Sequence, residues 1–176
     1  NVERLSPKKR ALYELLLKKQ KQEGGGAARA KIRRREQESD SLPLSFAQQR
    51  LWFIDQLEPG NPMYNSPVAV RLSGELNLAA LERTLAEIVR RHETLRTSFP
   101  VADGEPVQRI AEAGAVSLPV VDLGGLPEDE REARARLLAA EEARRPFDLA
   151  EGPLLRATLL RLGEREHVAL FTLHHI

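Results

Sequence analysis

Segments with helical apolar spacing alternate with strand-like segments between residues 42 and 176. Cap residues and apolar spacing predict three helices, from Ser45 to about Leu57, from Leu78 to His92 and from Pro127 to Arg144. Short apolar runs predict six strands, at residues 68–72, 95–101, 107–110, 118–123, 154–162 and 167–173. Because helices and strands are interleaved, we expect an α/β fold, in the form of an α+β sandwich.

Turn-forming residues separate these segments. Pro59-Gly60-Asn61-Pro62 ends the first helix, and Pro146 stops the third. Asp103-Gly104 lies between two strand-like runs, which predicts a hairpin with a short loop. Gly163-Glu164 joins the last two predicted strands. No internal repeat is visible, so we expect one folded unit over residues 42–176.

The first 41 residues differ from the rest in charge. Residues 1–40 carry 12 Lys and Arg against 6 Asp and Glu, a net charge of +6, whereas the remainder carries −5. We predict a short amphipathic helix at residues 1–20 and a flexible basic linker at residues 21–41. Acidic residues interrupt the basic run and no aromatic residues are interleaved with it, so we expect a solvated linker and no nucleic-acid or membrane partner.

Composition excludes several kinds of chemistry. The chain has no cysteine, which removes disulfides, thiolate nucleophiles and cysteine–zinc sites together. No apolar run is long enough to span a membrane, and no secretory signal pattern is present in the given sequence. We therefore expect a cytoplasmic protein.

Two adjacent histidines, His174 and His175, follow the last predicted strand. Neighbouring side chains on a strand point to opposite faces, so only one of the two rings can face a given cavity. This arrangement favours one structural ring and one working ring over a metal site, and no third ligand is placed to help. An imidazole near neutral pH can act as a general base or hydrogen-bond donor, although an ordinary core or surface pair fits the residue types as well.

Two other segments combine charged, aromatic and apolar residues. Residues 45–53 read Ser-Phe-Ala-Gln-Gln-Arg-Leu-Trp-Phe, which by spacing alone is a capped helix that presents aromatics to a core. Residues 90–99 place several charges at a helix end, where a solvated terminus is the simpler interpretation. Arg96 differs, because the pattern puts it inside the following strand, where a buried guanidinium would need a carboxylate partner.

Taken together, these segments resemble the condensation domains of nonribosomal peptide synthetases. Residues 45–52 match the first core motif, S-x-A-Q-x-R-L-W, and residues 91–99 match the second, R-H-E-x-L-R-T-x-F. His174-His175 resembles the opening of the third, H-H-x-x-x-D-G, cut after its third residue. Residues 59–65 and 146–154 also resemble typical stretches of the family. The resemblance covers about residues 42–176.

The resemblance implies a chloramphenicol acetyltransferase-like fold of two lobes, of which this chain would supply the N-terminal lobe only. It implies that His175 is the active-site residue, either as a base or as a group that positions the amine and stabilises the tetrahedral intermediate. His174 would be structural, and Arg96 would pair with the motif's aspartate, which is absent here. The other motif residues carried over from the family are Ser45, Gln48, Arg50, Trp52, Arg91, His92 and Glu93.

The implied reaction is amide-bond formation between an acyl or peptidyl thioester and an aminoacyl thioester. Upstream and downstream peptidyl carrier domains would deliver both groups on phosphopantetheine arms, with an adjacent adenylation domain, and this domain would bind no cofactor of its own. A fragment of this kind would be inactive, because the reaction channel lies between two lobes. Two alternatives stay open: an ester-forming acyltransferase of the same fold, and a non-catalytic recruitment domain.

Overall fold

The computed structural model describes residues 41–176, and nine of them form the edge strand β2, Asn65–Ser73. The helix predicted at residues 1–20 and all but the last residue of the linker predicted at residues 21–41 lie outside the described residues. Pairing extends from β2 through β8 (Glu166–His174) and β7 (Leu155–Gly163) to β6 (Val120–Asp122). The β6–β7 pair is parallel, whereas the β2–β8 and β8–β7 pairs are antiparallel.

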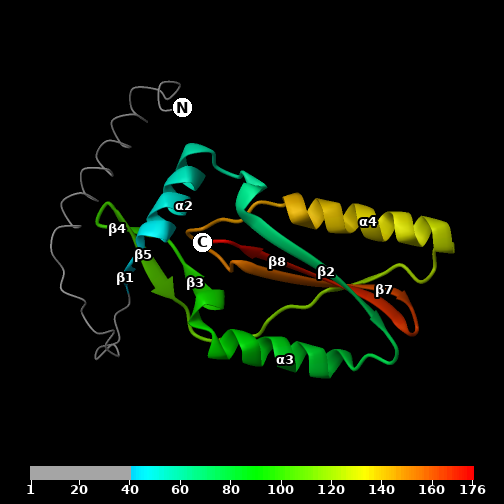
Figure 1. Cartoon of the computed structure of the whole chain (residues 1–176). Coiled ribbons are helices and arrows are strands. Elements are labelled where there is room, and N and C mark those ends of the chain that lie inside the picture. The colour runs from blue at the N-terminus through cyan, green and yellow to red at the C-terminus, as the bar shows by residue number, and fades with distance from the viewer. Residues whose placement is uncertain (1–40) are drawn as a thin grey trace. The chain divides into compact units, whose positions relative to one another are not determined.

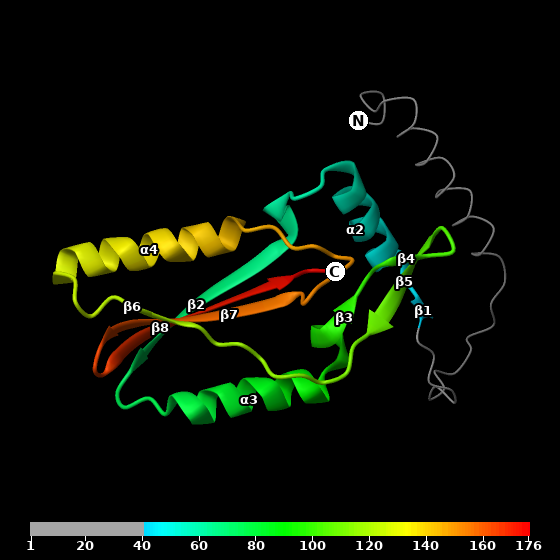
Figure 2. The same cartoon turned by 180° about the vertical axis from the view of Figure 1, so that it is seen from behind.

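A helix covers each face of this sheet (Figure 1). Helix α3 (Leu78–Arg91) lies on one face and α4 (Glu128–Arg144) on the other, as the view from behind also shows (Figure 2). Both faces of β7 and β8 are therefore covered, which explains why each strand contains consecutive apolar residues, such as Leu159-Leu160 and Ala169-Leu170, rather than a strict alternation.

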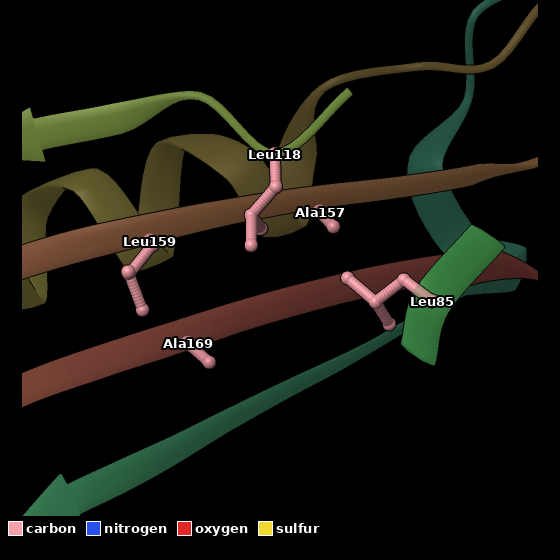
Figure 3. Packing of buried hydrophobic residues seen from close by; sticks show 5 residues of the cluster. All are labelled: Leu85, Leu118, Ala157, Leu159 and Ala169. Carbon is pink, nitrogen blue, oxygen red and sulfur yellow. The ribbon is translucent and has the colours of Figure 1, made fainter. Parts of the chain in front are cut away.

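The α3 face of the sheet holds one core cluster. Leu85 projects from α3 toward Ala157, Leu159 and Ala169 of the two central strands, and Leu118 comes from the segment before β6 (Figure 3). A second cluster on the α4 face joins Ala135 of the helix to Leu160, Leu162 and Leu170 of the sheet and to Leu123, which follows β6. Leu160 has no exposed surface at all. These two clusters fix the central strands between the helices.

A second, smaller sheet includes the strand at the start of the described chain. Strand β5 (Glu105–Ile110) pairs antiparallel with β1 (Leu42–Pro43), β3 (Thr97–Ser98) and β4 (Val101–Ala102). The predicted short-loop hairpin joins β4 to β5, and both loop residues have positive φ, 51° at Asp103 and 82° at Gly104. Asp and Gly are suited to this backbone, because they tolerate the left-handed region better than branched residues do.

Helix α2 (Phe46–Leu57) begins where the sequence predicts. The Ser45 hydroxyl accepts the Gln48 N–H at 3.2 Å, and the Gln48 side chain accepts the Ser45 N–H at 2.9 Å. This reciprocal pair is a capping box, which satisfies two of the otherwise unpaired donors at the helix start. A short 3₁₀ helix, η2 (Pro62–Tyr64), follows the predicted turn and leads into β2.

The strand predicted at residues 95–101 was wrong. Its first part belongs to a 3₁₀ helix, η3 (Glu93–Arg96), so Arg96 does not lie within a strand. The rest is split into β3 and β4, because Pro100 has no N–H to donate and the Phe99 N–H bonds the Leu149 carbonyl. Other boundaries also differ from the prediction. Strand β6 begins only after Pro119, whereas β2 starts earlier than expected and includes Pro67, which an edge strand tolerates.

No helix within residues 41–176 combines the length and apolar character needed to cross a membrane.

Candidate functional site

The last residue of β8, His174, is held from three sides. Its N–H donates to the Leu154 carbonyl at 3.1 Å, and in the β2–β8 register it lies opposite Asn65. Its ring meets the Tyr64 ring edge-on at 6.3 Å between centroids and the Phe147 ring edge-on at 6.1 Å. Edge-to-face aromatic contacts at these distances are favourable and fix the orientation of the ring.

The His174 ring also shapes the chain that follows it. Its Nδ1 accepts the backbone N–H of Ile176 at 3.2 Å. Partial burial lowers the pKa of His174 below its ordinary value of 6.5, and the nearby His175 lowers it further. A neutral ring protonated on Nε2 leaves Nδ1 free to accept, so the lowered pKa and the hydrogen bond favour the same state.

The neighbouring ring lies in a different environment. His175 is exposed, and its backbone N–H donates to the Tyr64 carbonyl at 2.9 Å. The side chain lines an open pocket of about 730 Å³ between the end of β8, η2 and helix α2. The other lining residues are Ser45, Ala47, Gln48, Arg50, Leu51, Ile54, Tyr64 and Ile176. The first and third sequence motifs, more than 120 residues apart, therefore meet at one pocket.

Residues of the first motif take two roles around this pocket. Ser45, Gln48 and Arg50 line it, whereas Trp52 anchors the helix below it. The Trp52 indole N–H donates to the Phe99 carbonyl at 3.3 Å, and its ring packs against the third core cluster. That cluster consists of Leu44, Phe99, Leu149 and Leu154, with Trp52, Phe147 and Ile176 packed against it. Trp52 of helix α2 and Ile176, which follows the two histidines, thus pack against the same apolar cluster.

The start of the second motif lies elsewhere, at the end of α3. Arg91 is exposed and pairs with Glu87 one helical turn earlier, at 2.6 Å. His92 is exposed and caps α3 through its backbone N–H to Ile88. Arg91 and His92 do not line the histidine pocket. They have the features of a solvated helix terminus.

Arg96 has local partners within this chain, and its expected pairing with the motif's aspartate stays a prediction. Its guanidinium donates to the Ala111 carbonyl and lies 3.7 Å from the carboxylate of Glu93. Its Nε is buried and has no hydrogen-bond partner within the described residues. Arg96 lines a second cavity, of about 680 Å³, separate from the pocket of His175. Its local contacts stabilise the turn after α3.

Three residues around the histidines had no role in the sequence interpretation. Tyr64 and Phe147 belong to stretches that resemble the family, but only the fold shows that their rings contact His174. Arg156 stacks on Phe147, with its guanidinium carbon 3.7 Å from the ring centre. No sequence signal marks Arg156, because its partners in residues 142–147 are not related to it by helical or strand spacing. Within residues 41–176, no three His, Cys, Asp or Glu side chains gather in a way that could hold a metal ion.

Comparison with protein-family models shows which family the chain belongs to. The model of the condensation domain family matches residues 38–176. The chain belongs to the condensation domain family. The motifs at residues 45–52 and 91–99 and the His174-His175 pair are therefore features of a condensation domain of a nonribosomal peptide synthetase.

Similar curated proteins are large peptide synthetases. One polypeptide of the linear gramicidin synthase of Brevibacillus parabrevis is 58% identical over 135 residues, which cover 77% of this chain and 3% of that polypeptide. Phosphinothricin tripeptide synthetase PhsC of Streptomyces viridochromogenes is 45% identical over 171 residues, or 97% of this chain and 16% of that protein. The chain thus spans a small part of these relatives.

Solved condensation domains share the fold. The starter condensation domain of rhizomide synthetase RzmA superposes with a TM-score of 0.68 at 30% identity, over 78% of this chain and 33% of that one. The first condensation domain of the CDA synthetase gives a TM-score of 0.66 at 26% identity, over 79% of this chain and 36% of that one. The likeness confirms the expected α/β, chloramphenicol acetyltransferase-like architecture, and the chain corresponds to about a third of each solved domain.

The environment of His174 predicts a measurable dependence of stability on pH. Because folding lowers the pKa of His174 from 6.5, the unfolded chain binds more protons than the folded chain between the two pKa values. The free energy of unfolding should therefore fall as the pH drops from 6.5 toward the pKa of the folded state. Urea unfolding across this range should show a smaller pH dependence for His174→Gln than for the wild-type chain. A His174 titration midpoint at or above 6.5 by NMR would contradict the prediction.

Proposed function

We propose that this chain supplies the histidine-bearing lobe of a condensation domain that forms amide bonds between carrier-bound substrates. One observation carries the proposal: His175 lies exposed in a pocket that the first core motif also lines. Membership of the family and the similarity to peptide synthetases support the same activity for the whole protein.

In the proposed reaction, the amine nitrogen of an aminoacyl thioester attacks the carbonyl carbon of an acyl or peptidyl thioester. The C–N bond forms through a tetrahedral intermediate, the C–S bond breaks, the amine loses a proton, and the donor arm leaves as a thiol. We assign to His175 the contact with the reacting amine. An imidazole in this pocket can accept the amine proton or donate a hydrogen bond that stabilises the intermediate.

The substrates are proposed to arrive on phosphopantetheine arms of upstream and downstream peptidyl carrier domains, with an adenylation domain next in the synthetase. The pocket of about 730 Å³ is open, so it admits a group delivered on an arm from outside. In this scheme the condensation domain supplies binding, orientation and proton handling, and the carriers supply the cofactor. The domain then needs no cofactor of its own.

The direct test uses the whole parent protein that contains this chain. Its donor carrier is loaded with an acyl or aminoacyl group and its acceptor carrier with an aminoacyl group, and intact mass spectrometry follows the acceptor. Appearance of the amide product on the acceptor carrier is expected. Transfer only to an alcohol acceptor would replace the proposal with an ester-forming acyltransferase, and no transfer to either acceptor would favour a recruitment domain.

The chain on its own is expected to form no product in this assay. It covers 33% of the length of the solved RzmA condensation domain, and in the proposed scheme the reaction channel would lie between this lobe and a second one. Residues 1–176 should therefore yield no amide product when mixed with the two loaded carriers, while the parent protein yields it under the same conditions. Product formation by residues 1–176 alone would show that one lobe is sufficient.

A further inference from the structure

Two strands, β2 and β7, bind residues at the C-terminal end of α4, one on each side of β8. From β2, the Asn65 side-chain amide donates to the carbonyls of Ala143 and Arg145, at 2.8 and 2.9 Å. Asn65 lies directly opposite His174 in the β2–β8 register. On the other side of β8, Arg156 of β7 lies opposite Thr172. The end of α4 is thus tied to the sheet on both sides of the histidine strand.

The Arg156 guanidinium binds this helix end through most of its donors. Its Nε donates to the Glu142 carboxylate, and its terminal nitrogens donate to the carbonyls of Pro146 and Arg145 at 3.0 and 2.7 Å. The Arg156 and Glu142 side chains are only 15% and 16% exposed, so the pair is largely shielded from solvent. A planar guanidinium with several fixed donors holds backbone carbonyls in a defined arrangement, which a lysine cannot do.

The residue that follows this fixed backbone is Phe147. The Arg156 guanidinium lies over one face of its ring, at 3.7 Å from the centroid. The same ring meets His174 at an interplanar angle of 74°. Cation–π stacking and an edge-on ring contact both depend on orientation, so Phe147 transmits the position of Arg156 to the His174 ring.

The last step runs from His174 to the pocket. Its Nδ1 accepts the Ile176 N–H, which closes a short turn with His175 at its centre. The orientation of the His174 ring therefore sets the backbone on both sides of His175. We propose that Arg156 and Phe147 are positioning residues, which hold His174 so that His175 points into the pocket lined by α2.

The contacts made by Arg156 separate this role from general packing. Arg156 forms a shielded ion pair with Glu142 and hydrogen bonds to the carbonyls of Arg145 and Pro146. Packing alone does not require these polar contacts. The chain also offers matched controls. Arg161 lies on the same strand and pairs with Asp122 of β6, but its side chain is half exposed. Phe171 lies on the same strand as His174 and packs on the α3 face instead.

NMR of residues 1–176 tests the positioning directly, without any catalytic assay. In the wild-type chain, His174 should be mostly in the tautomer that carries its proton on Nε2, and the Ile176 amide should be protected from exchange. In Phe147→Leu and Arg156→Lys, we expect a mixture of His174 tautomers and exchange of the Ile176 amide that is roughly fivefold faster or more, because its hydrogen bond is weakened. The controls Phe171→Leu and Arg161→Lys should leave both signals unchanged.

Two different test variants are used so that the test remains possible if one of them unfolds. Phe147→Leu keeps an apolar side chain and Arg156→Lys keeps the charge, so at least one should retain the wild-type circular dichroism spectrum. Wild-type His174 tautomer and Ile176 exchange in a folded variant of either kind would overturn the proposal. Equal changes in the two control variants would also overturn it, since the effect would then be general to the sheet.

The catalytic consequence rests on the proposed function and is measured separately in the parent protein. There, Phe147→Leu and Arg156→Lys should lower kcat roughly 10- to 100-fold with little change in KM, because a misplaced histidine affects the reacting centre rather than substrate binding. An unchanged kcat in an active parent would overturn positioning. If the parent forms no amide while the NMR differences appear, positioning stands and the proposed function fails.

Discussion

Replacing His175 with alanine in the parent protein is expected to lower the rate of amide formation by about 100-fold or more, the range typical of losing a general base or a comparable charge-stabilising group. The expectation follows from the exposure of the ring and its place in the pocket of α2. His175 contributes little to folding, because its ring is exposed and its backbone N–H to Tyr64 is kept in the variant. The KM for the loaded carriers should change little. Single-turnover mass spectrometry of the acceptor carrier measures the rate.

The matched control is His92→Ala, because His92 is the other exposed histidine among the described residues. His92 caps α3 by its backbone and does not line the pocket, so its loss should change the rate by less than about threefold, as for an exposed residue away from the site. Near-normal turnover by His175→Ala would remove the proposed role of this residue. An equal loss in His92→Ala would point to an effect on stability instead.

The second prediction with a large expected effect concerns the stability of the hydrophobic core between the sheet and α4. Leu160 of β7 is 0% exposed and packs in the cluster between the sheet and α4. Leu160→Ala removes buried apolar volume that the surrounding helix and strands cannot fully close, so we expect a loss of about 2–5 kcal/mol in the free energy of unfolding. Urea unfolding of residues 1–176, followed by circular dichroism, measures it.

The control for Leu160→Ala is the same substitution at Leu137. That side chain is 46% exposed on α4, so its loss should change stability by less than about 0.5 kcal/mol. A loss below about 1 kcal/mol for Leu160→Ala would mean that β7 is not the centre of the fold, because burial at this level normally carries a larger cost. The result would then contradict the sheet order described above.

Sequence patterns predict the regular elements well where local signals suffice. The Ser45 cap, the Asp103-Gly104 hairpin and the two long final strands all depend on residues within a few positions of one another. Amphipathic spacing likewise predicts α3, because the residues that face the sheet recur at helical intervals. The failures occur at residues 95–101, where a long-range contact decides the backbone. The Phe99 N–H bonds Leu149, and no local pattern encodes this partner.

The sequence motifs indicate candidate site residues but not their arrangement in space. The motifs single out His175 and the start of α2, yet their meeting at one pocket requires the sheet register that places β8 beside β2 and η2. In the second motif, the contacts of Arg96 with Glu93 and with the Ala111 carbonyl are likewise known only from the structure. Side-chain contacts between distant segments, such as Arg156 with the end of α4, leave no periodic signal in the sequence.

The central claim is that His175 meets the reacting group of a carrier-bound substrate. The most direct measurement uses the parent protein and a donor carrier whose phosphopantetheine arm bears a chloroacetyl thioester. A ring nitrogen positioned at the reacting group displaces chloride and forms a C–N bond, and peptide mapping by mass spectrometry locates the adduct. The account predicts alkylation at His175, with none at His92, and loss of the adduct in His175→Ala. Alkylation at another residue, or a bound carrier with no adduct on His175, would contradict it.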